Sequence, residues 1–171
     1  MCKKLIFPLF SIILATMIYS CKPEVSEYGD KFENIVLTGE GIFRNVNIGE
    51  TLEAVKSKEK GKLVEEDTDY LYYDFEINST DYYNISYYFD NTGLYETMFD
   101  ATFDKKADAQ ELFNNFNDYY TKLYGKPKNE EGFLIWQTSS DVSNKIEIAL
   151  VNNSTGNENG YVSLIISNFD Y

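Results

Sequence analysis

The chain of 171 residues is short enough to form one domain, and it is acidic, with 28 Asp and Glu residues against 15 Lys and Arg. It contains no histidine, which excludes a Ser-His-Asp triad, a Cys-His dyad, His-ligated zinc and an imidazole base acting near neutral pH. A formal net charge of −13 repels phosphate backbones, so nucleic acid is not expected as a partner.

The start of the sequence is typical of an export signal. Two lysines precede an apolar run from Leu5 to Ile18, and the small Ser20 stands directly before Cys21. The apolar run is shorter than the about 20 residues that a membrane-spanning helix needs. We therefore expect residues 1–20 to be a signal peptide that is removed during export. Removing two lysines from a net charge of −13 leaves −15.

The residues Ile18-Tyr19-Ser20-Cys21 resemble the lipobox of bacterial lipoproteins, in which an aliphatic residue stands three positions before the cysteine and a small residue directly before it. The resemblance implies cleavage before Cys21, lipid on its sulfur and amino group, and a location in the bacterial cell envelope, anchored to the outer membrane. Several acyl chains anchor a protein firmly, whereas one holds it only marginally. An ordinary signal peptide with a stray cysteine and an uncleaved anchor are the alternatives.

Polar residues follow the leader. Residues 21–34 include Pro23 and Gly29 and predict a flexible tether, so we expect a single domain over residues 35–171. If Cys2 is removed with the leader and Cys21 carries lipid, this domain has no thiol and therefore no disulfide. A short helix is predicted over residues 50–60, with few apolar residues to pack on a larger surface.

The middle of the chain changes to a period of two. Apolar and polar residues alternate over residues 70–77, 82–89 and 94–103, which predicts three strands. Asp90-Asn91-Thr92-Gly93 predicts a hairpin turn between the last two of them. The result is an antiparallel meander.

A helical period returns over residues 105–124, where apolar residues form one stripe and Gly125 and Pro127 end the helix. An Asn-rich loop is predicted over residues 152–160. Alternation predicts three further strands, at residues 133–138, 145–151 and 161–167.

A helix followed by three strands thus occurs twice. The predicted fold class is α+β, an antiparallel sheet of about six strands with two helices on one face and the helix-three-strand order repeated. The run Gly41-Ile42-Phe43-Arg44, the Tyr-rich strands, Tyr124-Gly125-Lys126-Pro127 and Trp136 resemble a class of uncharacterised bacterial envelope lipoproteins. The order of elements is similar at fold level to the beta-lactamase-inhibitor-protein fold, whose disulfides cannot form here.

Acidic residues give two candidate sites. Asp74 and Glu76 share one face of a predicted strand, as a glycosidase-like pair would, although a solvated strand face has the same pattern. Glu65-Glu66-Asp67 and Asp69 form an acidic stretch, but it lacks the alternating ligands and central Gly of an EF-type calcium loop. No nucleophile-elbow, phosphate-loop or zinc-protease motif occurs. We predict no catalytic residue, no metal and no cofactor.

Tyrosine is unusually frequent, with 15 residues. The predicted alternation places four of them on the sheet face opposite the helices, where a rigid ring with a polar tip suits recognition of proteins or sugars. The alternative is that Tyr simply has high strand propensity. The predicted binding face consists of Tyr70, Tyr72, Tyr82 and Tyr88.

These observations predict a lipid-anchored cell-envelope protein that is not an enzyme and that binds a protein or glycan partner. Two alternatives stay open. One is a carboxylate-dependent glycoside hydrolase acting on polysaccharide, and the other is a structural component of an envelope assembly.

Overall fold

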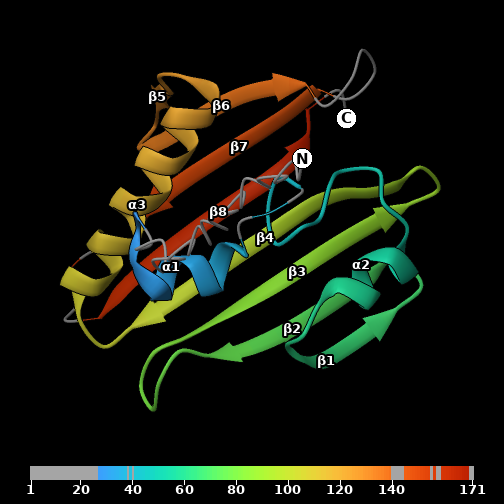
Figure 1. The fold of residues 1–171 in the computed structure, drawn as a ribbon, viewed down its shortest axis with the longest axis horizontal. Helices are drawn as coiled ribbons and strands as arrows, with labels where there is room; N and C mark the ends of the chain where they lie inside the picture. The colour runs from blue at the N-terminus through green and yellow to red at the C-terminus, as the bar shows by residue number, and fades with distance from the viewer. Residues whose placement is uncertain are drawn as a thin grey trace, which may run out of the picture.

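The computed structural model describes residues 27–37, 39, 41–139, 145–154, 156 and 159–169. Over these residues the chain forms one antiparallel sheet of eight strands and three helices (Figure 1). The expected signal peptide and Cys21 lie outside the described residues. None of the described helices is long and apolar enough to cross a membrane.

Two short helices and a meander of four strands make up the first half of the fold. The helices are α1 (Gly29–Val36) and α2 (Leu52–Lys58). Thr51 caps α2 by accepting a hydrogen bond from the backbone N–H of Ala54 at 3.3 Å. The strands are β1 (Lys62–Asp67), β2 (Tyr70–Glu76), β3 (Tyr82–Asp90) and β4 (Gly93–Phe103).

The second half begins with the long helix α3 (Lys106–Tyr124). Gly125 ends it with a φ of 85°, a conformation that residues with a side chain rarely adopt. A second meander follows, consisting of β5 (Lys128–Glu130), β6 (Phe133–Ser139), β7 (Lys145–Asn152) and β8 (Gly160–Asn168).

The two meanders join through their last strands, so the sheet order is β1-β2-β3-β4-β8-β7-β6-β5. β4 and β8 pair in antiparallel register from Glu96 opposite Ser167 to Phe103 opposite Gly160. A helix followed by four strands therefore occurs on each side of one central strand pair.

All three helices cover the same face of the sheet, in front of it in Figure 1. Phe32 of α1, Val55 of α2 and Phe116 of α3 are each at most 1% exposed and belong to one core cluster. The Phe116 ring lies 5.2 Å from that of Phe32 and 5.5 Å from that of Phe99 on β4, measured between centroids. Helix–helix and helix–sheet contacts thus meet in a single core.

The predicted sheet of about six strands with two helices is wrong, because β1, β5 and α1 add to it. β1 is an edge strand whose six residues are all exposed, so its sequence shows no alternation. The acidic stretch Glu65-Glu66-Asp67, considered above as a calcium loop, is the end of this strand. β5 has three residues, also exposed. The repeated unit is a helix with four strands instead of three. The individually predicted strands of residues 70–103 are confirmed.

Helix α1 occupies the last part of the range predicted to be a tether. Its apolar residues follow helical spacing and are buried, Phe32, Ile35 and Val36 each at 1% exposure. Only these three residues of the eight pack inward, and the polar composition of the other five hid the helix. The packed part of the chain therefore begins before residue 35.

Candidate functional site

The sheet face that points away from the helices is covered by none of the described helices or strands. Successive residues of a strand point to opposite faces, and on β3 Ile85 and Tyr87 are fully buried while Tyr82 and Asn84 are not. We call this second side the open face. On the five strands that follow β1 in the sheet it comprises Tyr70, Tyr72, Asp74, Glu76, Tyr82, Asn84, Ser86, Tyr88, Glu96, Met98, Asp100, Thr102, Tyr161, Ser163, Ile165, Ser167, Lys145, Glu147, Ala149 and Val151.

All four tyrosines of the predicted binding face lie on the open face, and three of them are in contact. Tyr70 pairs with Tyr88 across β2 and β3, with ring centroids 5.1 Å apart, and stacks on Tyr72 at 6.4 Å. The hydroxyl oxygens of Tyr70 and Ser86 lie 3.2 Å apart. Tyr82 stands at the start of β3, and among the described side chains it has no ring contact with the other three.

Two further tyrosines were missed from the sequence. A β-bulge shifts the register after Tyr88, and the ring of Tyr95 comes within 6.4 Å of the Tyr88 ring. Simple alternation along β4 places Tyr95 on the covered side, so only the bulge brings it to this cluster. Tyr161 lies opposite Thr102 on β8, and the period-two pattern of that strand was sufficient to find it.

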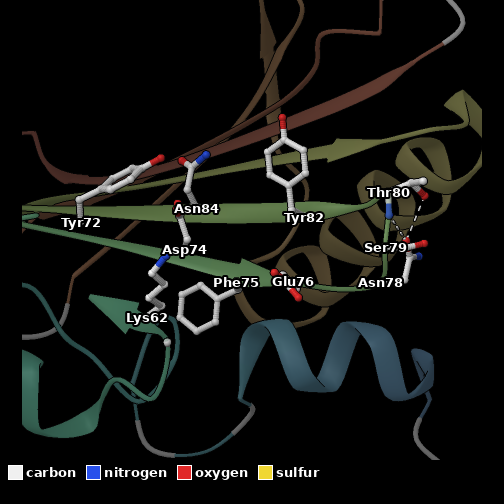
Figure 2. Close-up of a pocket in the computed structure, with 11 residues that line it drawn as sticks. Lys62, Tyr72, Asp74, Phe75, Glu76, Asn78, Ser79, Thr80, Tyr82 and Asn84 are labelled. Atoms are coloured by element: carbon white, nitrogen blue, oxygen red, sulfur yellow. Dashed lines mark hydrogen bonds between the residues drawn. The ribbon is translucent and has the colours of Figure 1, made fainter. Parts of the chain in front are cut away.

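An open-sided cavity of about 750 Å³ lies at one end of the open face, where β2 and β3 join (Figure 2). β1 begins at Lys62, opposite Asp74, so Glu76 has no neighbour on β1. Tyr72, Asn84 and Tyr82 point to the same side in Figure 2, with the amide between the two rings. The cavity is therefore bounded by three aromatic rings, those of Tyr72, Phe75 and Tyr82, and by polar groups that include the ammonium of Lys62.

The hairpin that closes the cavity is fixed by hydrogen bonds. Asp81 accepts from the backbone N–H of Asp104 at 2.9 Å and from the Asn78 side chain at 2.7 Å. The Asn78 oxygen accepts from the N–H groups of Thr80 and Asp81, both at 2.9 Å. Burial alone would raise the pKa of the Asp81 carboxyl, but these hydrogen bonds together lower it. The turn at the end of the cavity is thus held in place by hydrogen bonds within the turn and to Asp104.

The candidate acid pair, Asp74 and Glu76, lines this cavity. Burial and the neighbouring Asp74 carboxylate raise the pKa of Tyr72. Same-face positions on one strand are about 7 Å apart, so both carboxylates approach a bound molecule from the same side. Glycoside hydrolysis uses two acids that flank the scissile bond, whereas Asp74 and Glu76 both project from one side of one strand.

Carboxylates are also spread over the rest of the open face. Glu96 lies between Tyr88 and Ser167 in register, and burial raises the pKa of its carboxyl. Asp100 accepts a hydrogen bond from the Ser163 hydroxyl at 2.5 Å. The open face therefore combines aromatic rings with negative charge.

A buried ion pair lies directly behind β2 and β3, and sequence reasoning missed it. Arg44 donates to both oxygens of Glu59, at 2.8 and 2.9 Å, and to the carbonyl of Ile35 at 2.7 Å. The Tyr87 hydroxyl also donates to Glu59. The Arg44 guanidinium carbon lies 4.4 Å from the centre of the Phe75 ring. The pair therefore joins α1, α2 and the back of the Tyr-rich strands.

The electrostatics of this pair are those of a structural contact. Burial would lower the pKa of Arg44, but its hydrogen bonds to Glu59 and the charge of that carboxylate raise it. Burial, with the same negative charge, raises the pKa of Tyr87 well above its ordinary value. The Arg44 guanidinium therefore stays charged inside the core, and its contacts with Glu59 leave it unavailable to an external ligand.

No group of three or more Asp, Glu, Cys or His side chains that could hold a metal ion occurs in the described part of the chain. Comparisons with protein-family models, with curated proteins and with solved structures gave no match.

Proposed function

We propose that this protein is a non-catalytic binding protein, held to a membrane of the bacterial cell envelope by lipid on Cys21. The observation that supports the binding role is the open face, a broad sheet surface lined by a tyrosine cluster and a cavity. An uncovered face is ordinary for an antiparallel sheet. This face differs in its side chains, because it carries a cluster of tyrosines. Tyr is enriched in interfaces and offers a large contact area at low entropic cost.

The proposed anchor limits how far this face extends from the membrane. A fully extended chain spans at most about 3.5 Å per residue. Eight positions separate Cys21 from the start of α1 at Gly29, which keeps the start of the domain within about 30 Å of the lipid. Confinement to such a layer raises the effective concentration of a partner on the same membrane, so weak contacts suffice for binding.

The anchor is tested by comparing Cys21→Ala with Cys2→Ala, the substitution of the other cysteine, in a bacterium with two membranes. We expect the parent and Cys2→Ala to sediment with membranes, and their first peptide to begin at a lipid-modified cysteine. Cys21→Ala should lose the lipid and the processing. An unmodified thiol in the parent, or equal membrane partitioning of both variants, contradicts the anchor.

The binding role is tested with a photo-crosslinking amino acid at position 82 or at position 123 in living cells. Tyr82 on the open face is 49% exposed and Leu123 on α3 is 52% exposed, so the two positions are matched for accessibility. We expect adducts of defined mass from position 82 and none from position 123. Equal adducts from both positions, or none from position 82, would refute an open-face partner.

A glycoside hydrolase is the second candidate, because Asp74 and Glu76 do line the cavity. This function requires turnover of a polysaccharide by the parent and its loss in Asp74→Asn or Glu76→Gln. A parent that hydrolyses none of a broad polysaccharide panel removes the candidate.

A further inference from the structure

The five strands that define the open face carry an unbalanced set of charges there. Among their described residues, the only basic group on that side is Lys145, at the start of β7, whose ammonium nitrogen lies 5.6 Å from the centre of the Phe169 ring. At the edge of the sheet, Lys62 of β1 stands opposite Asp74 and lines the same cavity. The carboxylates on the same side are Asp74, Glu76, Glu96, Asp100 and Glu147.

None of these five carboxylates forms an ion pair with another described residue. The ion pairs that join described residues lie off the open face, on the helices, in the core and along β1: Lys31–Asp108, Arg44–Glu59, Lys56–Glu66, Lys58–Glu50 and Lys122–Glu27. On these five strands the open face is therefore negative, and its carboxylates are outside the ion pairs of the described residues.

Tyrosine rings stand beside three of the five carboxylates. Tyr82 pairs with Glu76 across β2 and β3, Tyr88 pairs with Glu96 across β3 and β4, and Tyr72 precedes Asp74 on the same side of β2. A carboxylate next to an aromatic face is suited to ammonium and guanidinium groups, which gain both a charge-assisted hydrogen bond and a cation–π contact.

The chain itself contains one example of this recognition. In the core, Arg44 binds the Glu59 carboxylate with two hydrogen bonds while its guanidinium lies 4.4 Å from the centre of the Phe75 ring. On the covered side the ring is Phe75 of β2 and the carboxylate is Glu59 at the end of α2, whereas on the open side β2 supplies both a ring, Tyr72, and a carboxylate, Asp74.

The spacing of the open-face carboxylates argues against a single small cation. Asp74 and Asp100 align with Asn84 in one row across three strands, which places them about 10 Å apart. Glu96 lies four residues from Asp100, about 13 Å along β4. An occupant must therefore carry several cations spread over its length, and a neutral glycan would leave these charges without partners.

We propose that the open face binds an extended polypeptide segment rich in Arg and Lys, laid across β2, β3 and β4, with one cationic side chain in the cavity between Tyr72 and Tyr82. This proposal rests on the proposed binding function and names the chemistry of its partner. Burial of the Glu96 carboxyl agrees with it, since a carboxylate already short of water gains more from a cation.

The test measures fluorescence anisotropy of a labelled peptide added to the full chain in detergent micelles. The peptide has about twelve residues of alternating Arg and Ser, which puts its cations about 7 Å apart on one side when extended. A matched peptide replaces every Arg with Glu. Both are titrated at about 50 mM and about 500 mM salt, because screening weakens exposed ion pairs.

Two triple variants with the same loss of charge are compared. The open-face variant is Asp74→Asn with Glu96→Gln and Asp100→Asn, which keeps side-chain shape. The control neutralises three exposed carboxylates on the helices, Glu53→Gln with Glu111→Gln and Asp118→Asn. Circular dichroism establishes that both variants are folded.

We expect the Arg peptide to bind the parent and the control within about twofold of each other, and the open-face variant about tenfold more weakly, as the loss of three exposed ion pairs predicts. Binding should weaken at high salt, and the Glu peptide should not bind. In the parent, Tyr82→Ala should weaken binding of the Arg peptide, whereas Tyr82→Phe, which keeps the aromatic ring, should bind it as the parent does.

Three results would overturn the proposal. Equal weakening by both triple variants means that net charge alone attracts the peptide. Failure of the Arg peptide to bind the parent while position 82 still forms adducts in cells means that the partner has another chemistry, and the binding function survives. Salt-insensitive binding of a neutral polysaccharide that the open-face variant retains identifies a glycan as the occupant.

Discussion

Breaking the buried pair of Arg44 and Glu59 should show how the strands behind the open face are held. The two residues are 3% and 8% exposed. Arg44→Met keeps an unbranched side chain but removes every donor, including the one that caps α1 at the Ile35 carbonyl. Glu59→Gln keeps an oxygen that can accept from the Tyr87 hydroxyl but removes the charge.

The expected free energies follow from burial. Each single substitution leaves the opposite charge buried without a partner, which costs about 3–5 kcal/mol. The double variant leaves no buried charge, and replacing a whole buried pair is often close to neutral. We therefore expect the double variant to be more stable than the sum of the single losses by at least about 3 kcal/mol.

Urea unfolding followed by the fluorescence of Trp136 gives these values. It is the only tryptophan in the sequence and is 2% exposed, so its emission changes when the core opens. Far-UV circular dichroism must give the same transition for a two-state treatment. The control cycle is Lys56→Met with Glu66→Gln, an ion pair whose side chains are 42% and 40% exposed, where each change should stay within about 1 kcal/mol. Additive losses in the Arg44–Glu59 cycle would refute the reasoning.

Three further predictions concern charge and backbone strain, each checked by urea unfolding. Because the folded-state pKa of Asp81 is lowered, its carboxylate stabilises the fold above the unfolded pKa of about 4 and loses that effect as pH falls further. Asp81→Asn should therefore be less stable than the parent at neutral pH, with a gap that narrows in acid. Because burial raises the folded-state pKa of Glu96, the parent loses stability as pH rises past that pKa, and Glu96→Gln should not. Gly93→Ala should destabilise more than Gly132→Ala: both have positive φ, but only at Gly93 would a Cβ collide, 2.4 Å from the Gly49 carbonyl oxygen. An equal pH profile in parent and variant, or equal losses at the two glycines, contradicts the respective prediction.

Sequence periodicity was sufficient where one side of an element is buried. The alternation in β2 and β3 predicted their faces correctly, because Leu71, Tyr73, Ile85 and Tyr87 all pack against the helices. The stripe on α3 was found for the same reason, with Leu112 and Phe116 buried in the core. Burial of one side imposes a regular spacing of apolar residues on a strand or helix, and this spacing is visible in the sequence.

Elements without that asymmetry escaped detection. β1 lies at the edge of the sheet with both sides exposed, so selection for a buried side left no pattern in its sequence. α1 packs through Phe32, Ile35 and Val36 alone, and eight residues are too few for a clear helical period. Neither β1 nor α1 was predicted, because each is stabilised by contacts with parts of the fold that are distant in sequence.

The same distinction holds for the residues of the candidate site: some follow from a pattern within one strand, and others depend on contacts between segments. The tyrosines of the open face follow from alternation within β2 and β3, whereas the pairing of Arg44 with Glu59 joins two irregular segments 15 residues apart. The bulge that brings Tyr95 to Tyr88 depends on the register between strands, which no pattern within one strand encodes. Sequence reasoning could therefore predict which residues share a face but not which of them touch.

The position of Arg44 also explains why the open face is negative. It is the only arginine in the sequence, and it is buried against Glu59 on the covered side of the sheet. The lysines that pair with acids lie on α1, α2 and α3, as at Lys31, Lys56 and Lys122. Lys62 of β1 stands opposite Asp74, but no described residue forms an ion pair with Asp74, Glu96 or Asp100. A partner that supplies ordered cations therefore gains contacts without first having to break an ion pair within the protein.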